Sequence, residues 1–247
     1  MIALPNEKDF MAEITSVFKK NSLSSLLSKE KAEKLFLLTN RLLTENEKYN
    51  LTAITEPKKV ILHHYADCAT LAEHLPKGAK ICDVGCGAGF PTLPLAILRE
   101  DIQILAMDAT EKRVNYVRET AQMLSLSGVS TLCARAEDAG KDIALRESFD
   151  FVTARAVAQM RILAELCLPL LKVGGKMIAM KGKNAHYELA DAKKALSVLG
   201  ARENRVIDIT LKNDEEEVSH PLVILDKVTK TPSAYPRPYA QISKKPL

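Results

Sequence analysis

The sequence predicts an α/β fold built on a seven-stranded, mostly parallel sheet, with an antiparallel pair of strands at one edge and an N-terminal helical cap. Three observations predict this fold. Strand-like apolar runs alternate with helical patterns from Ala79 onward, a glycine-rich turn joins the first strand to its helix, and no helix separates the last two strands.

The composition is that of an ordinary soluble globular protein. The chain has 247 residues, 47% of them hydrophobic and 27% charged, which suffices for one large α/β domain. No apolar run approaches the roughly 20 residues that cross a bilayer, and the first ten residues lack a signal-peptide pattern. We therefore expect a cytoplasmic protein with no membrane partner. Its net charge of +4 permits an RNA or phosphate partner.

The cysteines do not indicate a disulfide framework or a metal site. Their number is odd, and no pair has the spacing of a zinc motif with a nearby histidine. No metal is expected. The five cysteines are Cys68, Cys82, Cys86, Cys133 and Cys167.

Residues 1–75 are expected to form a helical cap. Apolar residues recur at helical spacing over Lys31–Leu43 and over a stretch upstream of it. The pattern is broken at Asn50-Leu51-Thr52, and a further helix is expected from about Pro57 to His74. The spaced apolar residues are Phe10, Ile14, Val17, Phe18, Leu35, Leu38 and Leu42.

A glycine turn follows the first strand, which is expected to end at Asp83. Gly85, Gly87 and Gly89 stand at alternate positions before a helix over Leu93–Arg99, whose first turn can accommodate Pro91 and Pro94. The G-x-G-x-G spacing differs from the G-x-G-x-x-G that holds a pyrophosphate. It resembles motif I of S-adenosylmethionine (SAM) methyltransferases; the alternative is an ordinary strand-turn-helix.

The second strand, Ile102–Met107, ends on Asp108. An acidic side chain roughly 20 residues beyond the glycine turn can accept both hydroxyl hydrogens of a ribose, although a solvated strand end is the simpler explanation. A helix over Glu111–Leu124 follows. Lys112 and Arg113 near its start either guide RNA or are simply solvated.

Three further strands bring polar residues to the same edge of the sheet. Strand three, Ser130–Ala134, leads into Arg135-Ala136-Glu137-Asp138, and in SAM-binding folds the residues at this place border the adenine. Strand four, Phe149–Ala154, delivers Arg155, and strand five, Lys176–Met180, delivers Lys181. Because ligands of open α/β sheets lie outside the carboxyl ends of the strands, Arg155 is expected in the ligand crevice.

Helices and the edge pair complete the predicted domain, residues 76–228. A helix over Arg161–Leu171 is expected to stop at a left-handed cap formed by Gly174-Gly175. The remaining elements are a helix over Tyr187–Leu199, strands over Val206–Leu211 and Pro221–Asp226, and a solvated hairpin tip at the acidic run Asp214–Glu217.

The tail, residues 229–247, is basic and contains Tyr235 and Tyr239 but no acidic residue. Cations interleaved with aromatic residues suit phosphate contact and base stacking. A proline-rich tail packed on the domain is the alternative reading.

Several stretches together resemble the RsmG (GidB) family of bacterial 16S rRNA guanine-N7 methyltransferases. The Gly-Phe-Pro extension of the glycine turn and Ala-Arg-Ala-Val-Ala are the most particular of them. The chain departs from the family at Cys68, where a serine is usual, and at Pro238-Tyr239-Ala240. The matching stretches are Asn50-Leu51-Thr52, His64 with Asp67, Asp83–Pro91, Lys112-Arg113, Arg135–Asp138, Ala154–Ala158, Lys181-Gly182 and Tyr235-Pro236-Arg237.

The resemblance implies a Rossmann-like SAM-dependent methyltransferase fold, SAM as the cofactor, and a guanine in the helix-18 loop of 16S rRNA as the acceptor. Arg155 and Lys181 are the candidate catalytic residues, and Lys112, Arg113 and Arg237 the candidate RNA-binding residues. The partner is then 16S rRNA or the small ribosomal subunit, and we expect a monomer. The candidate cofactor-binding residues are Asp83, Gly85, Gly87, Gly89, Phe90, Asp108, Ala136, Glu137 and Arg155.

The chemistry of guanine N7 agrees with these residues. N7 carries a lone pair, so methyl transfer requires no base, and positioning of the two reactants can supply most of the catalysis. His63 and His64 are accordingly expected to be packing or surface residues. N7 lies in the deep, narrow major groove of A-form RNA, so the guanine must come from a loop or an opened stem.

Two other functions remain open. One keeps the fold and SAM but transfers the methyl group to a small molecule or a protein. The other is a non-catalytic RNA-binding module that has lost the cofactor, which the intact glycines and Asp108 disfavour.

Overall fold

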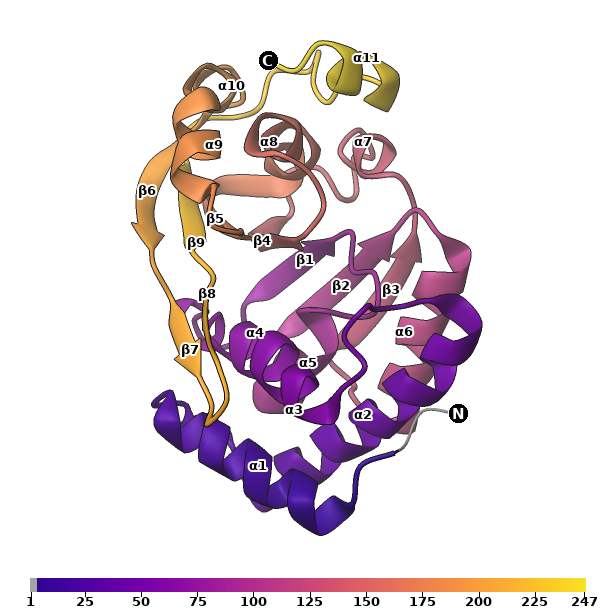
Figure 1. The fold of residues 1–247 in the computed structure, drawn as a ribbon. Coiled ribbons are helices and arrows are strands. Elements are labelled where there is room, and N and C mark those ends of the chain that lie inside the picture. Colours follow the sequence, from indigo (N-terminus) through magenta and orange to yellow (C-terminus); the bar gives the residue numbers. More distant parts are fainter. Residues whose placement is uncertain (1–3) are drawn as a thin grey trace.

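A seven-stranded sheet forms the centre of the computed structural model, which describes residues 4–247 (Figure 1). The first five strands are parallel, and β9 runs antiparallel to both of its neighbours, which confirms the predicted edge pair. From edge to edge the strands are β3 (Val129–Cys133), β2 (Gln103–Asp108), β1 (Lys80–Val84), β4 (Phe149–Arg155), β5 (Leu171–Met180), β9 (Leu222–Lys227) and β6 (Ala201–Ile207).

Helices cover both faces of the sheet, and neighbouring strand residues point into different cores. Ile81 packs in a core with the N-terminal helices, α5 and α6, whereas Cys82 packs in a second core with α8, α9 and α10. The helices of the sheet domain are α5 (Thr92–Leu98), α6 (Glu111–Met123), α7 (Ala136–Ala139), α8 (Met160–Cys167), α9 (Ala185–Asp191) and α10 (Lys193–Val198).

The N-terminal segment is helical, as predicted. The α2 helix begins after Ser28, whose hydroxyl accepts the N–H of Lys31, and ends before Asn50, which has a φ of +48°. The expected helix from Pro57 to His74 is a series of short helical pieces with a π-helical segment, Ile61–Ala66. The pieces are α1 (Glu7–Lys20), Ser24–Leu26, α2 (Lys29–Tyr49), α3 (Pro57–Val60), Ile61–Ala66, α4 (Asp67–Ala69) and Ala72–His74.

These N-terminal helices pack directly on the sheet. Tyr65 is fully buried, and its hydroxyl lies 2.7 Å from Thr39 Oγ1, which joins two of the helices beneath the sheet. Their apolar side chains belong to the same core as Ile81 and Ile104. The division into cap, sheet domain and tail stays a prediction. Within residues 4–247, no helix is both long and apolar enough to span a bilayer.

The prediction of a helix cap at Gly174-Gly175 is wrong. The α8 helix ends at Cys167, a 3₁₀ turn covers Leu168–Leu170, and β5 already begins at Leu171. Gly174 does have a positive φ of +86°, but it lies in an irregular part of β5, where the strand's pairing with β4 shifts register. The predicted helix over Tyr187–Leu199 is divided at Ala192 into α9 and α10.

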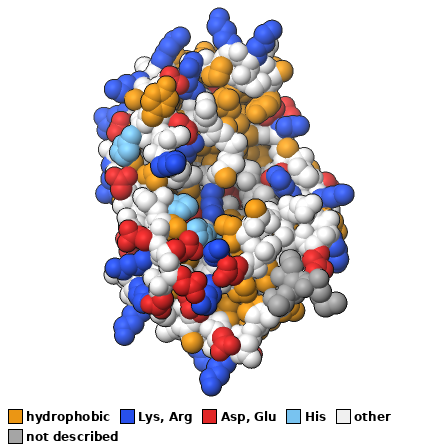
Figure 2. Space-filling view, viewed as in Figure 1, with side chains coloured by type: hydrophobic (Ala, Val, Ile, Leu, Met, Phe, Trp, Pro, Cys, Tyr) orange, Lys and Arg blue, Asp and Glu red, His pale blue; other side chains and the backbone are white. Residues whose placement is uncertain are grey.

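The acidic run is a hairpin tip, but it is not merely solvated. It joins β7 (Thr210–Lys212) to β8 (Glu217–Ser219), and in Figure 1 this hairpin reaches down to the N-terminal helices. Asp214 pairs with Lys20 of α1, and Glu215 pairs with Lys58 of α3. Charged side chains of both signs gather there in Figure 2.

The tail packs on the domain and carries a short helix, α11 (Tyr239–Lys244). Ile242 is fully buried, and Arg146 donates to the carbonyls of Thr231 (2.7 Å) and Tyr235 (2.8 Å). Arg237 donates through Nε (2.9 Å) and Nη2 (2.6 Å) to the fully buried carboxylate of Glu165 on α8. The packed tail is therefore the reading that the structure supports.

Replacement of Arg237 by alanine should lower the free energy of unfolding by about 3 kcal/mol, because the carboxylate of Glu165 would stay buried without its cation. Urea denaturation measures this. Arg202, an exposed residue of β6 that is 3.8 Å from Asp226, is the matched control, and its alanine variant should lose about 0.5 kcal/mol or less. Equal losses in the two variants would contradict a structural role for the Arg237 pair.

Candidate functional site

A cavity of about 310 Å³ lies outside the carboxyl ends of β1, β2, β3 and β4. It sits where the strand order reverses between β1 and β4, the place at which open α/β sheets bind ligands. Figure 2 shows a hollow at this position, with Lys and Arg side chains near its rim. The lining residues come from Val84-Gly85, Met107–Thr110, Arg113, Ala134–Glu137, Ala156-Val157, Leu166 and Tyr239.

The glycine turn forms one wall of this cavity through Gly85. The N–H groups of Gly85 and Cys86 both donate to the carbonyl of Met107, at 2.8 and 2.9 Å, and so hold the turn against the end of β2. Gly85 has a φ of +75°, and a Cβ there would lie 2.7 Å from Val157 Cγ2. Glycine is thus required both by the backbone angle and by the close approach of the loop after β4.

Asp108 lies at the end of β2, where the sequence predicts a ribose-binding carboxylate. Oδ1 accepts the N–H of Thr110 (2.9 Å), and Oδ2 accepts the N–H of Gly87 (3.1 Å) with Arg113 Nη1 3.6 Å away. A carboxylate has about four acceptor positions, so Asp108 retains capacity for hydroxyl donors in the cavity. A Cβ on Gly87 would meet only Gly85 O, at 3.9 Å, so this side of the turn is open.

Ala136 and Glu137, which follow strand three and are predicted to bind the cofactor, line the cavity from the start of α7. Leu166 of α8 and Tyr239 of α11 line it as well. The sequence gives no signal for Leu166, which is one apolar residue of a helix. It indicates Tyr239 only as part of a basic aromatic tail.

Asp83, Gly87, Gly89 and Phe90 are not among the lining residues. Asp83 is buried behind the turn, where it accepts the hydroxyls of Thr92 (2.6 Å) and Thr153 (3.3 Å). Burial raises its pKa to about 6, although these hydrogen bonds act in the opposite direction. A Cβ on Gly89 would lie 2.4 Å from Leu93 Cδ1. The structure therefore shows these residues shaping the turn.

Phe90 lies at the junction between the N-terminal helices and the sheet. Its ring stacks on His64 with centroids 4.2 Å apart, and the guanidinium carbon of Arg155 lies 5.8 Å from the Phe90 centroid. Phe90 and His64 are both nearly buried. The Gly-Phe-Pro extension therefore connects the glycine turn to the helical segment that contains His64.

Arg155 crosses this junction from the end of β4. Its Nη2 donates to the carbonyl of His63 (2.7 Å) and lies 3.0 Å from His64 Nδ1, and its Nε is 3.4 Å from Asp67 Oδ2. The next two residues, Ala156 and Val157, line the cavity. Arg155 thus ties the N-terminal helices to the cavity wall, although its own side chain faces the helices.

Two titratable partners of Arg155 are held out of water. Burial, and secondarily the cation of Arg155, lower the pKa of His64 to about 3, so its imidazole is neutral at pH 7. His64 Nδ1 also lies 3.1 Å from His63 O, and Nε2 lies 3.1 Å from Thr52 Oγ1, so both ring nitrogens have polar partners. Burial raises the pKa of Asp67, which Arg155 partly offsets.

The other predicted polar residues have varied surroundings. Lys181 Nζ donates to Ala158 O (2.8 Å) and pairs with Glu188 (2.6 Å). Its ammonium group therefore binds the loop after β4 and does not point into open space. Lys112 is exposed on α6, whereas Arg113 lines the cavity. Arg237 is bound to Glu165, so no RNA contact is proposed for it.

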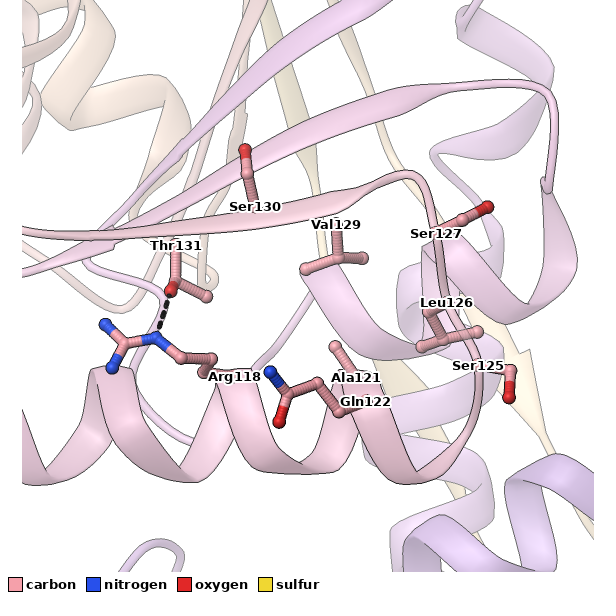
Figure 3. A pocket seen from close by; sticks show the side chains of 9 residues that line it. All are labelled: Arg118, Ala121, Gln122, Ser125, Leu126, Ser127, Val129, Ser130 and Thr131. Atoms are coloured by element: carbon pink, nitrogen blue, oxygen red, sulfur yellow. Dashed lines mark hydrogen bonds between the residues drawn. The ribbon is translucent and has the colours of Figure 1, made fainter.

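A second hollow, of about 500 Å³, lies between the end of α6 and β3 (Figure 3). Arg118 Nε donates to Thr131 Oγ1 (3.1 Å) across it. Its lining residues come from α6, from the loop that follows α6 and from the first part of β3. It shares no lining residue with the cavity of Asp108. None of the predicted site residues lines it.

Comparison with known proteins identifies relatives along most of the chain. Residues 31–217 match the family model GidB, described as rRNA small subunit methyltransferase G. Proteins named ribosomal RNA small subunit methyltransferase G are 41% identical in Clostridium perfringens, covering 92% of this chain and 95% of the relative, and 41% identical in Desulfitobacterium hafniense, covering 99% of each.

Solved structures share the fold at low identity. The TYW2 protein of M. jannaschii in complex with AdoMet has a TM-score of 0.51 and 17% identity over 66% of this chain and 75% of that one. A SAM-dependent O-methyltransferase from Thermotoga maritima has a TM-score of 0.50 and 17% identity over 76% and 72%. These similarities confirm the predicted Rossmann-like methyltransferase fold.

Neutral His64 should make stability depend on pH. Its pKa is about 3 when folded and 6.5 as a model value, so below pH 6.5 the unfolded chain gains a proton that the folded chain does not. Between pH 6.5 and 5, the wild type should therefore lose about 2 kcal/mol more stability than His64→Gln. Urea denaturation at a series of pH values measures this difference.

The raised pKa of Asp83 makes the protein more stable as the pH falls through part of this range, which is opposite to the effect of His64. Asp83 is present in both proteins, so its contribution cancels in the comparison. His186→Gln, at an exposed position on α9, is the control and should follow the wild type. Parallel pH profiles for wild type and His64→Gln would show that His64 is not held neutral.

Proposed function

Because the chain belongs to the GidB family of rRNA small subunit methyltransferases G, we propose that it transfers a methyl group from SAM to N7 of a guanine in 16S rRNA. The observation that carries this proposal is the cavity at the reversal of strand order, bounded by the glycine turn and by Asp108. We expect the chain to act as a monomer in the cytoplasm, on rRNA or on the small subunit.

The cavity residues fit SAM. Asp108 has acceptor capacity for a ribose, and Gly85 forms part of the cavity wall beside it. Ala136 and Glu137 border the part of the cavity beyond the end of β3. When bound, SAM supplies an electrophilic methyl group on its sulfonium. These residues bind and orient it.

The surroundings of Arg155 suit a reaction that needs no proton removal. Guanine N7 is already nucleophilic, and the titratable group beside Arg155 is a buried histidine with both ring nitrogens engaged. We propose Arg155 as a positioning residue that holds the segment around His64 against the cavity wall. Lys181 has a parallel role, since its bond to Ala158 O fixes the same loop.

Cations near the cavity supply candidate contacts to the RNA backbone. Arg113 and Arg135 line the cavity, and Lys112 is exposed beside Arg113 on α6. Neutralised phosphates fix the register of an RNA without reading its sequence. We propose this role for Lys112 and Arg113.

Incubation of the chain with labelled SAM and 16S rRNA, or with 30S subunits that lack the modification, should label a single guanine of the helix-18 loop at N7. Mapping of the labelled nucleotide measures this. If SAM binds but neither substrate is labelled, the rRNA acceptor is wrong, and a small-molecule or protein acceptor takes its place.

Two variants separate cofactor binding from transfer in the same assay. Asp108→Asn should weaken SAM binding more than about ten-fold, because the amide replaces one acceptor oxygen by a donor; Asp142→Asn, on the exposed loop after α7, is its control. Arg155→Lys should keep SAM binding but lower kcat, because a lysine has one nitrogen and cannot contact His63 O and Asp67 Oδ2 together as Nη2 and Nε of Arg155 do. Full transfer by Arg155→Lys would remove its positioning role.

A further inference from the structure

Tyr239 is the one residue of the tail among those that line the cavity of Asp108 in the described part of the chain. It is the first residue of α11 and is 42% exposed, so it is partly packed and partly accessible. The family match ends at residue 217. The family model therefore does not include this residue, although a relative is similar over 99% of the chain.

The segment that carries Tyr239 is firmly attached to α8. Two residues earlier, the backbone N–H and guanidinium of Arg237 donate three hydrogen bonds, of 2.6 to 2.9 Å, to the buried Glu165. Three residues later, Ile242 is fully buried. Tyr239 is thus held between two anchors, which lowers the entropy cost of a contact made by its ring.

The tail is attached at its far end as well. Arg161 of α8 donates through Nη2 to the carbonyl of Pro246 (2.9 Å) and through Nε to Leu247 O (2.5 Å). The residues from Arg237 to the end therefore follow α8, the helix whose Leu166 also lines the cavity. This attachment keeps Tyr239 at the cavity rim.

The neighbours of Tyr239 suggest which part of a ligand it meets. Leu166, Ala134 and Ala136 provide apolar surface, and Asp108 lies at the end of the next strand toward the middle of the sheet. A ribose bound by Asp108 would leave its base on the side of the residues that follow β3. Apolar side chains beside a partly accessible aromatic ring suit a nucleobase.

We propose that Tyr239 is a cofactor-binding residue that stacks on the adenine of SAM and closes the cavity from the tail. This inference rests on the proposed function, because it takes SAM as the ligand. It assigns the tail a role at the cofactor rather than at the RNA.

The absence of tryptophan from the sequence allows a direct test. Tyr239→Trp places a single indole at the cavity, and titration with SAM or S-adenosylhomocysteine should change its emission. Tyr187→Trp, on the 78% exposed Tyr187 of α9, is the matched control and should not respond. This readout does not depend on methyl transfer.

Calorimetric binding gives the second measurement. Tyr239→Ala should bind SAM roughly ten-fold more weakly than the wild type, and Tyr239→Phe should stay within about three-fold, because the ring remains. Adenosine should lose affinity for Tyr239→Ala by a similar factor, since the contact is to the base. Tyr187→Ala should bind as the wild type does.

The outcomes separate this inference from the proposed function. If the wild type does not bind SAM, the proposed cofactor fails and the inference fails with it. If the wild type binds SAM and Tyr239→Ala binds equally well, or the indole of Tyr239→Trp does not respond to bound SAM, only the inference is overturned. A Tyr239→Phe variant as weak as Tyr239→Ala would replace stacking by a role of the hydroxyl.

Discussion

The site depends on two backbone hydrogen bonds that converge on one carbonyl oxygen. The N–H groups of Gly85 and Cys86 donate to Met107 O and so lock the turn after β1 to the end of β2. Asp108, the next residue, then lies close enough for its Oδ2 to accept the N–H of Gly87. The backbone, rather than any charged pair, therefore sets the distance between the glycine wall and the carboxylate. Asp83 supports the turn from behind by accepting the hydroxyls of Thr92 and Thr153. These two hydrogen bonds offset part of the cost of burying its carboxyl group.

A second constraint joins the N-terminal helices to this wall. Arg155 reaches from β4 to His63, His64 and Asp67, while Phe90 stacks on His64 from the glycine turn. Movement of the helical segment would disturb both sides of the turn at once. The tip of the β7–β8 hairpin adds a third attachment, because Glu216 Oε1 lies 3.0 Å from His63 Nε2. Three parts of the chain that are distant in sequence thus meet at one histidine pair.

Local pattern was sufficient for the sheet and for the cavity floor. Strand ends in a parallel sheet share one edge, so Gly85, Asp108 and Ala136 could be placed together from chain order alone. Arg155 leaves the same edge, but its side chain faces the N-terminal helices and does not line the cavity. What local pattern cannot reveal is the partner of a charge. Arg237 and Glu165 are 72 residues apart, and each resembles a surface residue until the tail folds back on α8. The position of Tyr239 at the cavity could not be predicted for the same reason. The irregular start of β5 escaped prediction because a glycine with positive φ suits a helix cap and a distorted strand equally well.

The ion pairs of the hairpin tip also reduce the number of cations that are available to bind RNA. The sequence contains 35 Lys and Arg residues against 31 Asp and Glu. Lys20 and Lys58, which a simple count would offer to a polyanion, are already paired with Asp214 and Glu215 on the hairpin. A cation that already has a carboxylate partner cannot displace a condensed counterion from RNA without first giving up that partner. The number of ions released on RNA binding therefore reports the cations around the cavity that have no carboxylate partner within residues 4–247, such as Lys112, and not the net charge of the chain.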